Sequence, residues 1–82
     1  NVYMVKYLEE ILKTIKKGKI PKEIFFHFNN AFASIDLTKD LSLFYIKKMK
    51  ESGNRTYFRL RKGKYRAIFY IRPFKFEVRK AA

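Results

Sequence analysis

The sequence predicts an α+β fold in the order β-α-α-β-β-β, with an N-terminal helical hairpin packed on one face of a small antiparallel sheet. Apolar residues recur at helical spacing in the first half of the chain and alternate with polar residues in the second half. The 82 residues contain no repeat, low-complexity run or linker, so we expect a single domain over residues 1–82. Helices gathered on one face of an antiparallel sheet are the usual α+β arrangement.

The first half opens with a short apolar segment and a helix. Val2–Val5 is partly β-branched and fits either a first strand or the start of a helix. Apolar residues then recur with the spacing of one buried helical stripe, at Leu8, Ile11, Leu12 and Ile15. Gly18 follows as a natural C-terminal cap.

A second helix is predicted from Pro21, which suits a first helical turn. Its wide apolar face consists of Ile24, Phe25, Phe28, Ala31, Phe32 and Ile35. The link between the helices has only about three residues, which predicts an antiparallel helical hairpin. The polar segment Asp36–Asp40 ends the helix. His27, the one histidine of the chain, is interpreted as a helix-surface or core-edge residue and not as a catalytic base.

The second half has the pattern of strands. Leu41–Lys50 mixes aromatic and β-branched residues and predicts a strand or extended segment, and Glu51–Asn54 predicts a turn. Period-two alternation follows: Thr56, Phe58 and Leu60, then Ala67, Phe69 and Ile71, then Phe74, Phe76 and Val78 each define one face of a strand. Lys62–Lys64 supplies a hairpin turn, and Pro73 interrupts the last pair of strands.

Positive charge is concentrated in the second half. The net charge is +13, and residues 47–82 hold thirteen Lys and Arg, including all six Arg, against two acids. Such a concentration opposes compaction unless a polyanion or an acidic partner neutralises it. The sequence therefore favours a nucleic acid or an acidic protein as the partner over a generally basic surface.

Several classes of site are not indicated. The chain has no cysteine and one histidine, so we expect no metal and no cofactor. No apolar run approaches the roughly 18 residues of a membrane span, and no signal-peptide pattern opens the chain. We expect a cytoplasmic protein without membrane contact.

The alternation predicts a cationic face on the strands that follow residue 55. Its outward positions are Arg59, Arg61, Arg66 and Arg72, with Tyr57 and Tyr70 between them and no acid opposite. Arginine binds phosphates with two parallel hydrogen bonds, and exposed aromatic rings stack on unpaired bases. The alternative, an ordinary solvated sheet face, is less favoured because the four arginines have no acidic neighbour in this pattern.

The segment Tyr57–Ile71, YFRLRKGKYRAIFYI, resembles the RelE/ParE superfamily of toxin–antitoxin toxins. That family carries a Tyr-Arg-Leu-Arg-x-Gly-x-Tyr-Arg pattern followed by an apolar strand, which is similar to Phe58–Arg66 here. IKKMKESGN upstream resembles the basic approach to the hairpin, and VYMVKYLEEILKTIKK resembles the first strand and helix. The resemblance covers nearly the whole chain and implies the same β-α-α-β-β-β fold.

The RelE-like branch implies a ribosome-dependent mRNA endonuclease that drives a 2′-hydroxyl onto the adjacent phosphate without a metal. The resemblance assigns the transition-state arginine to Arg66, a basic position on the neighbouring strand to Arg59, and the late-strand arginine to Arg79. The implied RNA-binding residues are Tyr57, Arg61, Lys62, Lys64, Lys47, Lys48, Lys50 and Lys80. The expected partners are mRNA, the ribosome and an acidic antitoxin, with which the toxin forms a hetero-oligomer.

A non-enzymatic alternative stays open. Tyr57 stands where the family has a second basic residue, and no tyrosine follows Arg79. These two departures favour a ParE-type topoisomerase inhibitor, or a basic nucleic-acid-binding module on the same fold.

Overall fold

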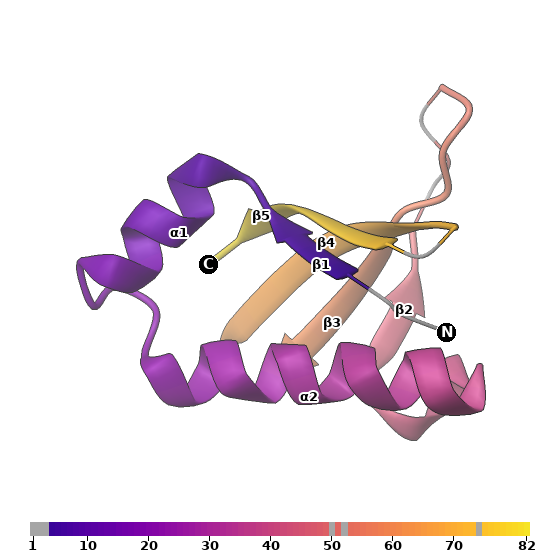
Figure 1. The fold of residues 1–82 in the computed structure, drawn as a ribbon, viewed down its shortest axis with the longest axis horizontal. Helices are drawn as coiled ribbons and strands as arrows, with labels where there is room; N and C mark the ends of the chain where they lie inside the picture. Colours follow the sequence, from indigo (N-terminus) through magenta and orange to yellow (C-terminus); the bar gives the residue numbers. More distant parts are fainter. Residues whose placement is uncertain (1–3, 50, 52, 74) are drawn as a thin grey trace.

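The computed structural model describes residues 4–49, 51, 53–73 and 75–82 (Figure 1). The elements in order are β1 (Met4–Tyr7), α1 (Glu9–Lys16), α2 (Lys22–Thr38), the short 3₁₀ helix η1 (Leu41–Leu43), β2 (Ile46–Lys48), β3 (Phe58–Lys62), β4 (Tyr65–Arg72) and β5 (Lys75–Ala81). The α+β order is confirmed. Two bounds differ from expectation: β1 begins at Met4, with Val2 outside the described residues, and η1 leaves only three residues of 41–50 in β2.

The five strands form one sheet in the order β1-β5-β4-β3-β2. The pairs β2–β3, β3–β4 and β4–β5 are antiparallel, as predicted. β1 runs parallel to β5, with Met4 opposite Lys75 and Tyr7 opposite Val78. Two helices and three strands separate β1 from β5 along the chain, which is ample length for a parallel crossover.

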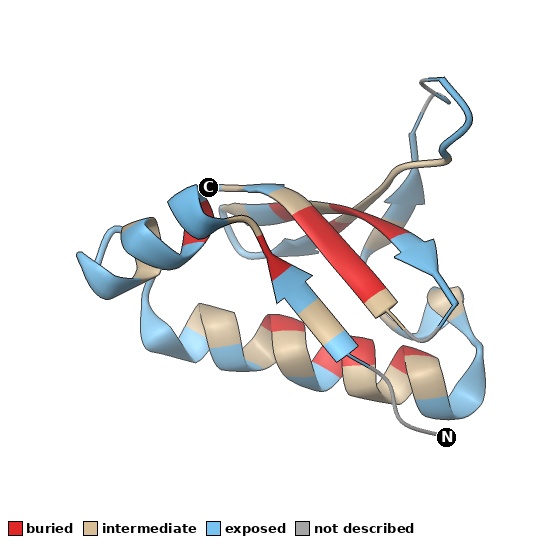
Figure 2. Ribbon diagram, turned by 45° about the horizontal axis from the view of Figure 1, so that its top comes forward, coloured by how far each residue is buried: buried red, intermediate tan, exposed pale blue. Residues whose placement is uncertain are grey.

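The core lies between α2 and one face of the sheet. Figure 2 shows that the buried positions of α2 lie on its side toward the sheet. The ring of Phe32 lies 4.9 Å from that of Phe69 and 5.1 Å from that of Phe76. The other members that are nearly or fully buried are Phe28, Ala31, Ile35, Leu60, Ala67 and Val78. The apolar parity predicted for the strands therefore holds at Leu60, Ala67, Phe69, Phe76 and Val78, whereas Ile71 is exposed. Phe74, also predicted for this face, lies outside the described residues.

α1 closes one end of this core, and α2 spans the sheet (Figure 1). Ile11 of α1 is buried in the same cluster. The backbone N–H of Leu8 donates to the carbonyl of Val78 at 3.2 Å, which fixes the start of α1 beside β5. Gly18 follows the helix with φ +80°, as expected of a C-terminal cap. α1 therefore lies where its first turn can border the uncovered face of the sheet.

A two-residue turn joins β3 to β4 and fixes their register. Gly63 has φ +59°, and Lys64 is not among the described residues with positive φ, which is the pattern of a type II′ hairpin turn. Lys62 then lies opposite Tyr65 and Leu60 opposite Ala67. A slip of one residue would move every apolar side chain of the strand to the other face.

Candidate nucleic-acid interface

The uncovered face of the sheet carries cations in a row that crosses the strands. The register places Lys47 of β2 opposite Arg59 of β3, Arg59 opposite Ile68 of β4, and Ile68 opposite Lys80 of β5. Alternation puts all four on the face that α2 does not cover. Three of the four residues are basic, Lys47 and Lys80 at the ends and Arg59 between them. The row therefore forms a line of positive charge across the sheet.

An open groove of about 950 Å³ follows this row, and we call it the central groove. Leu8 and Glu10 border it at α1, and Met49 borders it at β2. Its other lining residues are Lys47, Lys48, Tyr57, Arg59, Ile68, Arg79 and Lys80. Six of the residues predicted from the sequence are thus brought together: Tyr57, Arg59, Arg79, Lys47, Lys48 and Lys80.

A bulge in β5 explains how two consecutive basic residues line one groove. Phe69 lies opposite Val78 and Ile68 opposite Lys80, so Arg79 is the extra residue of β5. A bulge bends the strand and redirects side chains. Arg79 and Lys80 therefore both border the central groove, which strict alternation would not allow.

Arg59 lines the groove and has a hydrogen-bond donor without a partner among the described residues. Its residue is half-buried, and within the described chain its Nε is buried without a hydrogen-bond partner. A buried donor without a partner costs about 1–3 kcal/mol. Arg59 is therefore poised to gain from an anion or a water molecule in the groove.

Arg66 borders a second hollow beside the central groove. It is exposed on β4 and lies directly opposite Arg61 of β3, and like charges in opposite positions repel. The second hollow, of about 450 Å³, is lined by Arg66 together with Glu10, Ile11, Thr14, Ile68, Arg79, Lys80, Ala81 and Ala82. Four of these, Glu10, Ile68, Arg79 and Lys80, also line the central groove. Arg66 is therefore adjacent to the groove without lining it.

Three predicted RNA-binding residues lie toward the β3–β4 turn instead. The guanidinium of Arg61 lies 5.4 Å from the ring centroid of Tyr45. Lys62 lines a separate hollow with His27, and the ammonium of Lys64 lies 5.5 Å from the ring of Tyr65. The structure does not gather these three with the groove, and Lys50 lies outside the described residues.

His27 agrees with its interpretation as a core-edge residue. It is half-buried on α2, and its ring meets that of Phe44 edge-on at 6.2 Å. Burial, with the charge of Lys62 as a smaller cause, lowers the pKa of His27 below its usual range. It belongs to the side of the sheet that α2 covers and not to the cationic face.

The prediction of an exposed Tyr70 ring is wrong. Tyr70 is only 3% exposed, and its hydroxyl donates to the carboxylate of Glu77 on the neighbouring strand. The guanidinium of Arg55 lies 4.5 Å from the Tyr70 ring centroid, and the Tyr57 ring meets it edge-on at 5.6 Å. Tyr70 is therefore covered from outside and cannot serve as a free stacking surface.

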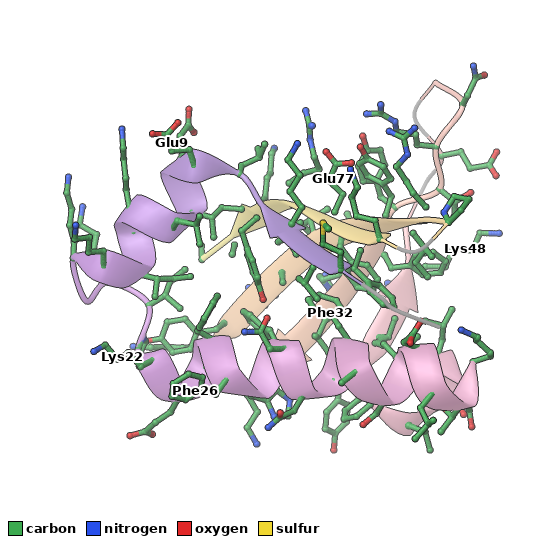
Figure 3. The ribbon with its side chains drawn as sticks, in the orientation of Figure 1. Glu9, Lys22, Phe26, Phe32, Lys48 and Glu77 are labelled. Carbon is green, nitrogen blue, oxygen red and sulfur yellow. The ribbon has the colours of Figure 1, made fainter. Side chains whose placement is uncertain are left out.

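The expectation of a face without an acid is also wrong, because Glu77 lies on it. In Figure 3 Glu77 projects from the sheet on the side away from α2, opposite to Phe32. Its carboxylate lies 3.8 Å from Arg79 and 4.0 Å from Arg72. The parity of Phe76 and Val78 was the signal that could have placed Glu77 here, because both neighbours face the core.

Other kinds of site find no support in the described residues. No cluster of three or more histidines, cysteines or carboxylates that could hold a metal ion occurs among them. No helix in the described part of the chain is long and apolar enough to cross a membrane.

Comparison with known proteins identifies the fold. No protein-family model matches the sequence, and no curated protein matches it either. A chain of the archaeal RelE–RelB complex from Pyrococcus horikoshii OT3 superimposes with a TM-score of 0.73 at 20% identity, over 99% of this chain and 93% of that one. A chain of the RelB–RelE antitoxin–toxin complex from Methanococcus jannaschii gives a TM-score of 0.67 at 22% identity, over 94% and 87%. The chain has the RelE-like fold that its sequence predicted.

Proposed function

We propose that this protein is the toxin of a type II toxin–antitoxin system and that it inhibits translation by cleaving mRNA on the ribosome. The likeness to chains from two toxin–antitoxin complexes supports the first part. The central groove carries the second part, because Arg59, Arg79 and three lysines line it together with the half-buried Tyr57. Such a target implies a cytoplasmic protein.

The proposed reaction is an internal phosphoryl transfer. The 2′-oxygen of one nucleotide bonds to the adjacent phosphorus while the bond from phosphorus to the next 5′-oxygen breaks. The products are a 2′,3′-cyclic phosphate and a 5′-hydroxyl, and the proton lost by the 2′-hydroxyl balances the one gained by the 5′-oxygen. We assign Arg66 to the extra charge of the phosphorane, and Arg59 and Arg79 to the flanking phosphates.

Two features support the assignment of the groove to RNA. Single-stranded RNA needs a cationic track for its backbone and an aromatic surface for a base, and the groove combines five basic residues with Tyr57. The unpaired Nε of Arg59 also gains a partner when a phosphate oxygen binds.

The dependence on the ribosome follows from what the groove lacks. Among its described lining residues there is no histidine, and Glu10 at the rim is the one carboxylate. General acid–base catalysis contributes typically 10²–10⁴-fold, so a groove without a histidine–carboxylate pair should act weakly on RNA alone. On the ribosome the mRNA is held in a fixed conformation, which supplies orientation instead.

An acidic antitoxin is the second proposed partner. The chain carries a net charge of +13, and the cationic face is where an acidic segment would bind with the greatest electrostatic gain. We expect that segment to be disordered alone and to fold on binding. Covering the central groove would inhibit the toxin by occlusion.

Primer extension on an mRNA in a translating extract tests the proposal. Wild-type protein should stop synthesis and produce cuts within codons of the ribosomal A site, and naked RNA should be cut poorly. Lys22→Ala, an exposed residue at the start of α2, is the matched charge control and should cut normally. Intact mRNA together with an inhibited gyrase reaction would replace the nuclease by the ParE-type alternative, which the departure at Tyr57 favours.

A further inference from the structure

Glu77 is a buried carboxylate in the middle of the cationic face. Its side chain is only 8% exposed, although it lies on the side of the sheet that α2 leaves uncovered (Figure 3). A buried carboxylate is costly unless it is paired and hydrogen-bonded. Its presence among the basic residues of this face therefore calls for a physical reason.

The surroundings of Glu77 keep it ionised. The hydroxyl of Tyr70 donates to one carboxylate oxygen, Oε2. This hydrogen bond lowers the pKa of Glu77, and the charges of Lys75, Lys6 and Arg72 lower it further against the opposing effect of burial. Lys6 is the direct neighbour of Glu77 on the parallel strand β1. The group is thus a fixed negative charge under working conditions.

The two oxygens of Glu77 face different arginines. Oε2, which accepts from Tyr70, lies 4.0 Å from Nη1 of Arg72. Oε1 lies 3.8 Å from Nη1 of Arg79. Tyr70 fixes the carboxylate from one side, so Oε1 stays directed toward the central groove that Arg79 lines.

Arg79 lies at the bulge of β5, where its side chain needs a contact that holds it in one position. The bulge leaves it without a cross-strand residue in register, so its position along the groove is not fixed by a neighbour on β4. An arginine side chain has several rotatable bonds, and holding it in one geometry costs entropy. A buried, oriented carboxylate two residues away supplies the missing restraint.

We propose that Glu77 is a positioning residue that holds the guanidinium of Arg79 in the central groove, with Tyr70 orienting the carboxylate. A role of this contact in RNA cleavage rests on the proposed function. The positioning of Arg79 by Glu77 does not. A competing interpretation is that Glu77 merely occupies Arg79 until a phosphate displaces it. The two differ in sign: removing the charge of Glu77 slows cleavage if it positions Arg79 and accelerates cleavage if it competes with RNA.

The test is a double-mutant cycle of Glu77→Gln and Arg79→Ala, measured as the rate of mRNA cleavage on ribosomes. Glutamine keeps the shape and an oxygen for the Tyr70 hydroxyl but loses the charge. In the wild-type background Glu77→Gln should slow cleavage about tenfold or more, because a displaced catalytic cation loses its alignment. In the Arg79→Ala background the same change should matter less than about twofold, because coupled residues are not additive.

Binding of a short single-stranded RNA provides a second readout that does not need activity. Glu77→Gln removes one negative charge, so its affinity for RNA should be unchanged or a few times tighter while cleavage falls. Glu23→Gln makes the same change of charge at an exposed site on α2 and should leave cleavage unchanged. Weaker binding and slower cleavage in proportion to a lowered melting temperature would mean a purely structural role and would overturn the proposal.

NMR of the arginine Nε–Hε groups keeps the proposal testable if the wild type proves inactive on ribosomes. The Arg79 signal, assigned with Arg79→Lys, should be ordered in wild type and mobile in Glu77→Gln, while the Arg66 signal stays the same. If Glu77→Gln does not fold, Tyr70→Phe removes the orienting hydroxyl alone and should loosen Arg79 partly. An Arg79 signal unaffected by either change, or cleavage accelerated by Glu77→Gln, would refute positioning.

Discussion

The two faces of β3, β4 and β5 are formed by alternating residues of the same strands, and they differ in composition. Toward α2, Leu60, Phe69 and Val78 are fully buried. On the other side Arg59, Arg66 and Lys80 lie on the same strands, within one to three residues of them. The first face has no charged residue at these positions. The second face holds cations on neighbouring strands, where like charges repel and lower stability.

This contrast assigns different tasks to the faces. Burial of apolar area supplies the folding free energy, so substitutions on the α2 side should act on stability. Exposed strand positions contribute little to stability, so the cationic face is free to be shaped by what it binds. The predictions below compare the two faces, beginning with the largest effect.

Phe69→Ala should destabilise the protein the most. The Phe69 ring is fully buried and contacts the rings of Phe32, Phe58 and Phe76. Loss of a buried phenyl group costs about 3–5 kcal/mol, a large part of the stability of a domain of this size. Urea unfolding should show the loss directly. An unchanged unfolding midpoint would contradict the assignment of the core to this face.

Arg66→Ala should produce the reverse effect, a loss of activity with little loss of stability. Arg66 is the neighbour of the buried Ala67 on β4. Arg66 is exposed, so the free energy of unfolding should change by less than about 0.5 kcal/mol. Loss of a cation that stabilises the phosphorane should cost roughly 3 kcal/mol, or about a hundredfold in cleavage rate. Arg66→Lys keeps the charge and loses the paired donors, so it should be intermediate. Full toxicity of Arg66→Ala in cells would remove Arg66 from the proposed site.

Salt should weaken binding to the cationic face and leave the core unaffected. If four of the five basic residues of the central groove contact phosphates of single-stranded RNA, log affinity should fall with log salt at a slope of about −3. Between 50 and 200 mM salt, affinity then decreases roughly fiftyfold, which fluorescence anisotropy can follow. Association with an acidic antitoxin should slow over the same range. A flat salt response would mean that these residues do not contact the ligand.

The smallest effect is a dependence of stability on acid pH. The hydrogen bond from the Tyr70 hydroxyl lowers the pKa of folded Glu77 below its usual range, so the folded state binds fewer protons than the unfolded state. Its contribution to stability is fully present above about pH 5 and is lost as the pH falls through the folded pKa. Unfolding free energies between pH 5 and 3 should therefore fall less steeply for Glu77→Gln than for wild type. Equal slopes would show that the Tyr70 hydrogen bond does not favour the charged form.

Local pattern was enough to predict much of the fold. The parity of Leu60 and Phe69 identified the buried face, and Gly63 identified the hairpin turn, because both depend on short-range geometry that the sequence records directly. The same parity put Arg59 and Arg66 on the opposite face. Apart from Glu77, what was missed depended on contacts between elements, which the pattern within one strand does not record.

Three features of the site depend on how the elements of the fold contact one another. The bulge that turns Arg79 into the groove arises from the match between β4 and β5, and nothing in the period-two pattern marks it. The burial of Tyr70 depends on Arg55, from the loop before β3, covering its ring. The position of Glu10 at the groove follows from where α1 closes the sheet, which the helical spacing of the neighbouring apolar residues does not record.

The direct opposition of Arg61 and Arg66 across the hairpin should make the melting temperature depend on the buffer. Two like charges in register raise the free energy of the folded chain, and any anion that lies between them lowers it again. Such an anion binds the native state more tightly than the unfolded chain, and it therefore raises the apparent stability in proportion to the logarithm of its concentration. Phosphate, nucleic acid and an acidic protein would act in this way alike. Inside a cell rich in polyanions, the protein would then resist unfolding better than its behaviour in a dilute chloride buffer indicates.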